Sequence, residues 1–436
     1  MIWWAADRRL LKLMPEMRTL EDLDVDGRRV LLRADLNVPL RADAGTVSVA
    51  DDTRIRAALS TIEELARRGA RIVLVSHLGR PRDREPELSM RPVADRVREL
   101  SGAHVSLASA VVGEEVEALT EHLARGEILV LENVRYEAGE TKNDPELARA
   151  LAELADVYVN DAFGTAHRAH ASTEGVAHLL PCAAGRLMER EVRALTGILE
   201  RPARPLVAVL GGAKVTDKIA LVEHFLDVAD SVLIGGAMSF PFLAARGHAV
   251  GASPCLKDDV DCARQALRKA AETHHSLELP EDLIVAARLS AEAKRHTTDS
   301  PDVPGGWLGL DIGPLTAARY GRAIQAAGTV FWNGPMGAFE CEPFALGTRV
   351  IAQALAGTSA TTVVGGGETV EALRELGLES SVNHVSTGGG ATLELLQGLS
   401  LPGVEALSAG AREPDDRGAQ LSATDAGQLP SAGALR

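Results

Sequence analysis

The stretch RIRAALSTIEELARRGARIVLVS, residues 54–76, decides the fold class, because a helix pattern in it is followed directly by a strand pattern. Between Ile55 and Leu65 apolar side chains recur every three or four residues, which is typical of one face of an α-helix. Gly69 follows this pattern, and glycine is common at the position where a helix ends. The run 71–76 is apolar and β-branched, as in a strand buried on both faces. We therefore predict a helix over 54–68 that connects two parallel strands.

The same alternation of strand and helix patterns runs through the rest of the chain. In most cases a glycine-rich or polar turn follows the strand pattern. This order predicts an α/β protein of two doubly wound parallel sheets with Rossmann-like layering, whose ligands bind beyond the carboxyl ends of the strands. The further strand patterns lie at 30–33, 128–132, 157–160, 206–210, 231–234, 283–287, 329–332, 361–364 and 383–386.

Composition limits the class of protein. At 436 residues the chain is long enough for two large domains, and its 46% hydrophobic and 25% charged residues are ordinary for a globular protein. The net charge of −15 opposes binding to nucleic acid or to an anionic membrane. No apolar run is long enough for a membrane span. Four cysteines without paired spacing suggest neither a zinc site nor a disulfide framework, which predicts a cytoplasmic protein.

Changes of pattern along the chain suggest its domain boundaries. The segment 189–205 is helical and is then broken by Pro202 and Pro205, so we interpret it as the connection between two domains. The end of the chain is rich in Ala, Gly, Ser, Asp and Pro without periodicity. We predict an N-terminal extension (1–16), an N-terminal domain (17–188), an inter-domain helix and hinge (189–205), a C-terminal domain (206–390), a segment that closes the fold (391–407) and a disordered tail (408–436).

Basic side chains follow the predicted strands of the first half. Guanidinium groups bind phosphate and carboxylate through paired hydrogen bonds, so a convergent set predicts an anion site. Any one of these residues alone would more often be a solvated surface group. Asp35 and Asn37 in LLRADLNVP (31–39) could hold a hydroxylated ligand, although they also suit an ordinary turn. The basic residues are Arg54, His77, Arg80, Arg135, His167, Arg168 and His170.

Glycine-rich loops follow the strands of the second half. LGGAKVTDK (210–218) combines Gly211 and Gly212 with Lys214 and Lys218 near a predicted helix start, where backbone amides and the helix dipole favour phosphate. The spacing differs from a Walker A loop, and the alternative is a glycine turn with two exposed lysines. Three more glycine turns follow strand patterns, at 235–236, 365–367 and 388–390.

Two acids of the second half could serve a nucleotide. Glu368 begins a helix pattern and could reach a Mg²⁺ ion held by phosphates, since Mg²⁺ usually takes one or two protein carboxylates. The alternative is an acid that only stabilises the helix start. Glu340, in FWNGPMGAFE (331–340), could bind a pair of ribose hydroxyls, whereas the rest of that segment also suits a tight turn.

Eight segments, taken together in this order and spacing, resemble the phosphoglycerate kinase family from about residue 17 to 407. They are LLRADLNVP, SHLGRP, NDAFGTAHRAHAS, LGGAKVTDK, WLGLDIGP, FWNGPMGAFE, GGGETV and HVSTGGGA. The resemblance implies a glycolytic enzyme that transfers a phosphoryl group reversibly between 1,3-bisphosphoglycerate and ADP, giving 3-phosphoglycerate and ATP. It implies Mg²⁺ bound with the nucleotide, with Mn²⁺ as an alternative ion. It also implies a monomer whose two domains face a cleft, with 3-phosphoglycerate on the N-terminal domain and nucleotide on the C-terminal one, and which closes about a hinge.

The resemblance also assigns roles to individual residues of this sequence. It implies catalytic roles for Arg54, Lys214, Gly367 and Gly390. It implies that 3-phosphoglycerate is bound by Asp35, Asn37, Arg54, His77, Leu78, Gly79, Arg80, Arg135, Arg168 and His170. It implies that the nucleotide is bound by Gly211, Gly212, Lys214, Lys218, Gly235, Gly236, Gly309, Asn333, Pro335, Gly337, Glu340, Gly366, Gly367, Glu368 and Thr369, with Glu368 also the metal ligand.

Departures from the family pattern affect this assignment unequally. Glu368 stands where the family usually has Asp, and its extra methylene predicts weaker Mg²⁺ binding or a preference for Mn²⁺, with activity retained. Leu36 and Ala237 are interpreted as packing changes and Arg82–Asp83 as a surface change.

Two other classes of protein stay open. One is a nucleotide-binding scaffold or regulator with weak catalysis, and the other is a dinucleotide-dependent oxidoreductase, although its GxGxxG fingerprint is missing.

Overall fold

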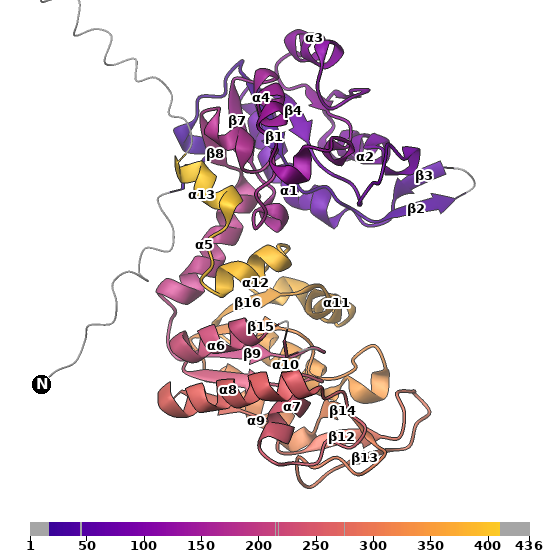
Figure 1. The fold of residues 1–436 in the computed structure, drawn as a ribbon, viewed down its shortest axis with the longest axis vertical. Coiled ribbons are helices and arrows are strands. Elements are labelled where there is room, and N and C mark those ends of the chain that lie inside the picture. Colours follow the sequence, from indigo (N-terminus) through magenta and orange to yellow (C-terminus); the bar gives the residue numbers. More distant parts are fainter. Residues whose placement is uncertain (1–16, 44–45, 214, 217, 274, 410–436) are drawn as a thin grey trace, which may run out of the picture.

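The computed structural model describes residues 17–43, 46–213, 215–216, 218–273 and 275–409. It contains two α/β units, and a long helix, α5 (Arg186–Glu200), runs between them (Figure 1). The predicted extension and nearly all of the predicted tail lie outside the described residues. The last two residues of helix α13 (Pro402–Ala409) occupy the first two positions of that tail. None of the described helices has the length and apolarity needed to cross a membrane.

The first unit is built on a six-stranded sheet that is parallel throughout. Its order is β5 (Val105–Leu107), β6 (Ile128–Val130), β4 (Arg71–Val75), β1 (Arg29–Arg33), β7 (Val157–Asn160) and β8 (Cys182–Ala184). Its helices are α1 (Thr53–Arg67), α2 (Arg91–Ser101), α3 (Glu114–His122) and α4 (Pro145–Glu153). The four strand predictions for this unit are confirmed. The sequence reasoning missed β5 and β8, because their short sequences, VSL and CAA, contain polar or small residues instead of the apolar, β-branched run that marks β6.

The second unit repeats this plan with another parallel sheet of six strands. Its order is β11 (Ser276–Glu278), β10 (Ser231–Ile234), β9 (Leu206–Leu210), β15 (Thr329–Asn333), β16 (Thr361–Gly365) and β17 (His384–Val385). Its helices are α6 (Ile219–Val228), α7 (Ser239–Ala245), α8 (Lys257–Thr273), α9 (Pro314–Gln325), α10 (Leu346–Gly357) and α11 (Gly367–Glu375). The predicted fold class, two doubly wound parallel sheets, is confirmed.

The strand prediction at 283–287 is wrong about the sheet to which the strand belongs. That strand, β12 (Leu283–Ala286), lies in a separate antiparallel sheet between β13 (Arg295–Thr297) and β14 (Leu308–Ile312). The chain returns directly from β12 through β13 without a crossover helix, so parallel pairing is impossible. Four consecutive buried residues look the same in either kind of sheet. The sequence reasoning also missed the hairpin of β2 (Leu40–Asp43) and β3 (Thr46–Val49), which projects from the first unit (Figure 1).

The two units share packing through α5, α12 (Gly390–Leu396) and α13. One continuous hydrophobic cluster includes Val73 of the first sheet and Ala208 of the second, together with Leu195 of α5 and Leu395 of α12. After α12 the chain returns to the first unit, where α13 packs against β8 (Figure 1). The predicted domain and hinge boundaries stay predictions, but both units depend on these shared helices for part of their core.

Candidate active site

Two predicted site residues, Asp35 and Arg54, connect the loop after β1 to the start of α1 through a hydrogen bond. Arg54 lies in the first turn of α1, and its Nη1 donates a hydrogen bond to Oδ2 of Asp35, 2.6 Å away. Asp35 is nearly buried, whereas the Arg54 side chain is 41% exposed. The buried carboxylate therefore orients a guanidinium group that remains accessible to a ligand.

A second group of predicted residues fixes the loop after β4. The amide of Gly79 donates to Oδ1 of Asn37 (2.8 Å), and its carbonyl accepts from Nη1 of Arg135 (2.5 Å). Leu78 exchanges two backbone hydrogen bonds with the side chain of Asn133, which the sequence reasoning did not single out. Burial lowers the pKa of Arg135, although a guanidinium group stays charged. These contacts hold the loop and the arginine in one rigid arrangement.

Four of the predicted basic residues line one hollow of about 670 Å³ at this edge of the sheet. They are Arg80, Arg135, Arg168 and His170. Arg82, interpreted from the sequence as a surface change, lines the same hollow. Arg80 and Arg168 are exposed, and His170 is buried. This concentration of guanidinium groups in a chain of net charge −15 supports an anionic ligand.

Beneath this hollow lies a layer of buried polar groups that the sequence reasoning missed. Arg33, at the end of β1, has its Nη2 3.1 Å from Nδ1 of His77 and donates from Nε to Oγ of Ser172 (2.9 Å). The Ser172 hydroxyl donates to Glu140 (2.7 Å), and the His170 ring lies 3.6 Å from the same carboxylate. Burial favours the neutral acid, but the nearby His170 ring, the charge of Arg33 and the hydrogen bond from Ser172 outweigh it and lower the pKa of Glu140.

This buried layer decides the protonation state of His77. An arginine has only donors, so the guanidinium at Nδ1 requires a lone pair there and places the ring proton on Nε2. Burial, and then the positive charges of Arg33 and Arg135, lower the pKa of His77 well below its usual value. His77 thus stands in the predicted basic group as a neutral hydrogen-bond donor.

His167 and Gly390 meet where the two units approach each other. Nε2 of His167 accepts from Nε of Arg168 (3.0 Å), and burial lowers the pKa of the His167 ring. Gly390 is the first residue of α12, and a side-chain carbon built on it would lie 3.5 Å from the same ring nitrogen. The amino end of α12 therefore lies against the basic edge of the first sheet.

The glycine loops of the second unit form a wall that is built from backbone. The amide of Gly212 donates to the carbonyl of Pro335 (3.0 Å). The amide of Gly236 donates to the carbonyl of Met336 at the same distance. A side-chain carbon at Gly211 would lie 2.1 Å from the carbonyl oxygen of Pro335, so only glycine fits there without a backbone shift. The predicted glycines therefore let three loops approach closely.

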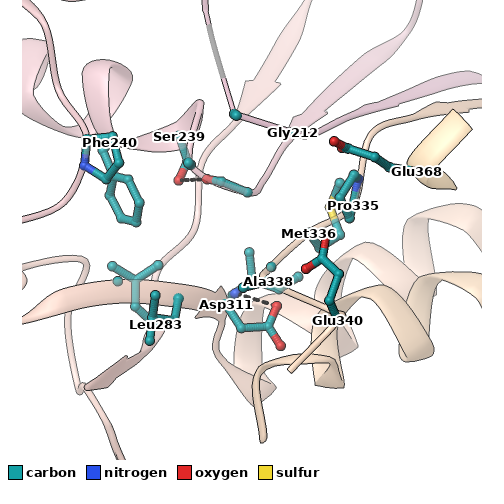
Figure 2. A pocket seen from close by; sticks show the side chains of 18 residues that line it. Gly212, Ser239, Phe240, Leu283, Asp311, Pro335, Met336, Ala338, Glu340 and Glu368 are labelled. Atoms are coloured by element: carbon teal, nitrogen blue, oxygen red, sulfur yellow. Dashed lines mark hydrogen bonds between the residues drawn. The ribbon is translucent and has the colours of Figure 1, made fainter. Parts of the chain in front are cut away.

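A pocket of about 240 Å³ opens against this wall. Figure 2 shows Glu340 and Glu368 on one side of it and Phe240 and Leu283 on the other. A mostly apolar slot with carboxylates at one end suits a ligand with a flat apolar part and polar groups beyond it. The predicted residues that line the pocket are Gly212, Gly236, Gly309, Pro335, Gly337, Glu340 and Glu368.

Of the two predicted lysines of the glycine loop, the structure describes only Lys218. Lys214 lies outside the described residues. Nζ of Lys218 donates to the carbonyl of Gly211 (2.7 Å) and lies 3.4 Å from that of Asn333. The helix that follows, α6, begins only at Ile219. Lys218 therefore ties the loops after β9 and β15 together at the base of the wall.

Three other predicted nucleotide residues support the wall from behind. Oγ1 of Thr369 is buried and accepts from the amide of Gly334 (2.7 Å). Asn333 is also buried, and a side-chain carbon at Gly366 would lie 2.8 Å from its Nδ2. Gly235 directly follows β10, and its amide donates back to β9. These residues position the loops around the pocket.

A hollow of about 470 Å³ brings predicted residues of both units together. Thr53 and Arg54 at the start of α1 line one wall of it. Gly366 and Gly367 at the start of α11, with Gly389 before α12, line the other. Gly366 has a φ of +94°, a conformation that glycine adopts without strain. The free amides at the start of α11 thus share a space with the Arg54 guanidinium.

Glu191 of α5 is a further residue that the sequence reasoning missed. It is fully buried, and its carboxylate lies 2.8 Å from Nε2 of His384 and accepts from the amide of Thr387 (2.8 Å). This contact fixes the loop before α12 to the helix between the units. The sequence did contain a signal for Glu191. It lies on the same helix face as the apolar residues Met188 and Leu195, and an acid on such a face needs a polar partner when it is buried.

Comparisons with known sequences point to one family for this chain. The family model described as phosphoglycerate kinase matches residues 20–399. A phosphoglycerate kinase of Chloroflexus aurantiacus is 52% identical over 396 residues, covering 89% of this chain and 98% of that protein. One of Moorella thermoacetica is 51% identical over 391 residues, with the same coverage.

Two solved structures extend the comparison to the fold. The structure of phosphoglycerate kinase from Coxiella burnetii matches with a TM-score of 0.82 at 41% identity, covering 90% of this chain and 99% of that chain. The phosphoglycerate kinase from Pyrococcus horikoshii matches with a TM-score of 0.77 at 33% identity, with the same coverage. Sequence and fold therefore point to the same relatives over nearly the whole chain.

Proposed function

The chain belongs to the phosphoglycerate kinase family, and from this premise we propose how its residues divide the reaction. It is a glycolytic kinase that transfers a phosphoryl group reversibly between 1,3-bisphosphoglycerate and ADP. The observation that carries the division of roles is the hollow between the two units, where Arg54 lies opposite the start of α11. One substrate site lies on each unit, so the reacting groups meet in this hollow.

In this proposal the carboxyl edge of the first sheet binds 3-phosphoglycerate. The paired donors of Arg80, Arg135 and Arg168 bind its phosphate. Asp35 and the loop of Gly79 bind the hydroxyl and carboxylate end, next to Arg54. The neutral ring of His77 contributes a directed Nε2–H donor. The patch therefore combines the positive charge of the arginines with hydrogen bonds at the Asp35 carboxylate, the Gly79 loop and the neutral His77 ring, which orient the ligand.

The pocket of the second unit binds ADP or ATP in this proposal. The apolar wall with Phe240 and Leu283 takes the base, and Glu340 accepts hydrogen bonds from the ribose. The loop of Gly212 and the amides at the start of α11 receive the phosphates, because backbone N–H groups at a helix start favour anions. Lys214 adds a positive charge near the transferring group, as the resemblance implies.

The residues present fit a Mg²⁺ ion that arrives with the nucleotide. Among the described residues no group of three or more His, Cys, Asp or Glu could hold a metal by itself. Glu368 is a single exposed carboxylate on the rim of the nucleotide pocket, which suits an ion whose other ligands are phosphates and water. When bound, Mg²⁺ would neutralise charge on the phosphates. We propose that the longer side chain of Glu368 holds it less tightly than an aspartate would.

Transfer needs positioning and charge neutralisation more than a covalent intermediate. Arg54 from one unit and Lys214 from the other would flank the moving phosphoryl group, and the amides at Gly367 and Gly390 would bind its oxygens. Closing the units about α5 would expel water that otherwise hydrolyses the acyl phosphate. The proposal is completed by a monomeric state and a cytoplasmic location, which the resemblance and the cysteine usage favour.

The test is an assay of the purified chain with 3-phosphoglycerate, ATP and either Mg²⁺ or Mn²⁺. The acyl phosphate is detected through coupled NADH oxidation, and Lys214→Ala serves as the control. Metal-dependent turnover that is lost in the variant supports the assigned roles. Tight ADP binding by the folded protein without turnover under either ion would favour the scaffold alternative.

A further inference from the structure

Arg374 has no role in the reaction described above, yet it lies at the boundary between the units. It stands in the last turn of α11, the helix whose first turn holds Gly367 and Glu368. It lines the 470 Å³ hollow together with Arg54, and also a second groove of about 960 Å³ beside the β2–β3 hairpin. Asp51, on the first unit, lines the same two spaces.

Asp51 is tied to the start of α1. Its Oδ1 accepts from the amide (2.8 Å) and the hydroxyl (2.5 Å) of Thr53, the residue before Arg54. These hydrogen bonds, and then the positive charge of Arg374, lower the pKa of Asp51. The carboxylate therefore already interacts electrostatically with the arginine of the other unit.

The present partner of Arg374 lies on its own unit. Its Nε is 3.3 Å from Oε2 of Glu379, with the two side chains 48% and 39% exposed. An exposed ion pair contributes little to stability, so the guanidinium can change partner at small cost. Of the two described arginines that line this hollow, Arg54 is already bound to Asp35, so Arg374 is the one that is available to Asp51.

We propose that Arg374 is a positioning residue that exchanges Glu379 for Asp51 when the two units close, and so holds the start of α1 against α11. This inference rests on the proposed closure during phosphoryl transfer. The pair would connect the helix that presents Arg54 to the helix that presents Gly367 and Glu368. Loss of water from the closing hollow strengthens the attraction between the two charges.

The kinetic test is a double-mutant cycle. Asp51→Asn removes the charge but keeps an acceptor for Thr53, and Arg374→Gln removes the cation. We expect each variant to lower kcat about two- to fivefold, the range of a single exposed pair, and the double variant to fall no further than either. KM for both substrates should change by less than about twofold, because neither residue binds substrate. Arg264→Gln, which removes an exposed arginine with a local acid partner from the same unit, is the matched control and should leave kcat unchanged.

The second readout does not depend on turnover. The closed fraction is followed by energy transfer between dyes on cysteines introduced in α2 and α10, in a background where Cys255, Cys262 and Cys341 are serine. With 3-phosphoglycerate and an unreactive ATP analogue, both single variants should be less closed than the parent. Raised salt should reduce closure by a larger fraction in the parent than in the variants, which lack the screened pair.

Three results would overturn the inference. They are additive effects of the two substitutions, an unchanged closed fraction in the variants, and a raised KM in Arg374→Gln alone, which would show direct ligand binding. Failure of the proposed function is distinguishable, because then the parent chain itself shows no turnover while the energy-transfer comparison still reports on the pair.

Discussion

The two ligand-facing edges of this protein are built by different means. On the first sheet an outer set of arginines stands above the buried layer of Arg33, His77, Ser172 and Glu140. On the second sheet the wall is backbone, with glycines such as Gly211 where loops touch. Long charged side chains need a fixed layer beneath them to hold one geometry, whereas strand ends already fix backbone amides. The first edge is therefore sensitive to loss of charge, and the second to added volume.

The strongest test of this contrast is Glu140→Gln. The variant keeps an acceptor for Ser172 but removes the carboxylate whose charge interacts with the buried Arg33. We expect a loss of about 3–5 kcal/mol in the free energy of unfolding, because the charge of Arg33 then stays buried without the Glu140 carboxylate that is linked to it through Ser172. The measurement is urea unfolding at neutral pH. Glu99→Gln, at an exposed pair with Arg96, is the control and should change stability by less than about 0.5 kcal/mol.

The same substitution predicts a change in pH dependence. The pKa of Glu140 is lowered in the folded protein, so its stabilisation is complete above the ordinary glutamate pKa and is lost as the pH falls through the folded value. Between these two values the stability of the parent should fall more steeply with decreasing pH than that of the variant. Parallel curves would show that the Glu140 carboxylate is not coupled to Arg33.

Gly211→Ala tests the second edge. Its methyl group would overlap the carbonyl of Pro335, so we expect a loss of about 2–3 kcal/mol in stability from forced backbone shifts. ADP affinity, measured by calorimetry, should fall at least about tenfold, because the nucleotide wall moves. Gly197→Ala in α5, where nothing lies within 4 Å, is the matched control and should be neutral or stabilising by about 0.5–1 kcal/mol. Unchanged ADP affinity in Gly211→Ala would contradict the role given to the wall.

The contrast between the edges also explains what the sequence could predict. The glycine wall follows from local signals, because each turn directly follows a strand in the chain. The buried layer depends on contacts such as Arg33 with Ser172, which are 139 positions apart, and no local pattern records them. The one available signal was a charged residue at the end of an apolar strand. Sequence predicted His77 as a site residue, but its protonation state depends on Arg33 and could not be predicted.

Arg54→Ala tests the point where the two edges meet. The side chain is 41% exposed and held by one hydrogen bond, so its loss should leave the fold intact. Turnover should fall at least about tenfold, equivalent to roughly 1.4 kcal/mol of barrier, because one positive charge opposite the start of α11 is lost. Arg56→Ala, two residues further along α1 and paired with Asp52, is the control for steady-state kinetics. Equal turnover in the two variants would remove Arg54 from the proposed role.

The smallest expected effect concerns Glu368, the acid at the first turn of α11 on the rim of the backbone-built wall. The backbone wall that is proposed to hold the nucleotide is rigid. The length of the Glu368 side chain therefore decides how well its carboxylate reaches the metal. Mg²⁺ demands near-ideal distances, whereas Mn²⁺ tolerates more. We expect Glu368→Asp to tighten Mg²⁺ binding to the ADP complex by about two- to fivefold and to change Mn²⁺ binding less. Calorimetric titration of each ion into the ADP-saturated proteins measures this without turnover. An identical Mg²⁺ affinity in both proteins would show that the wall does yield by the length of a methylene, and that it is less rigid than its close glycine contacts imply.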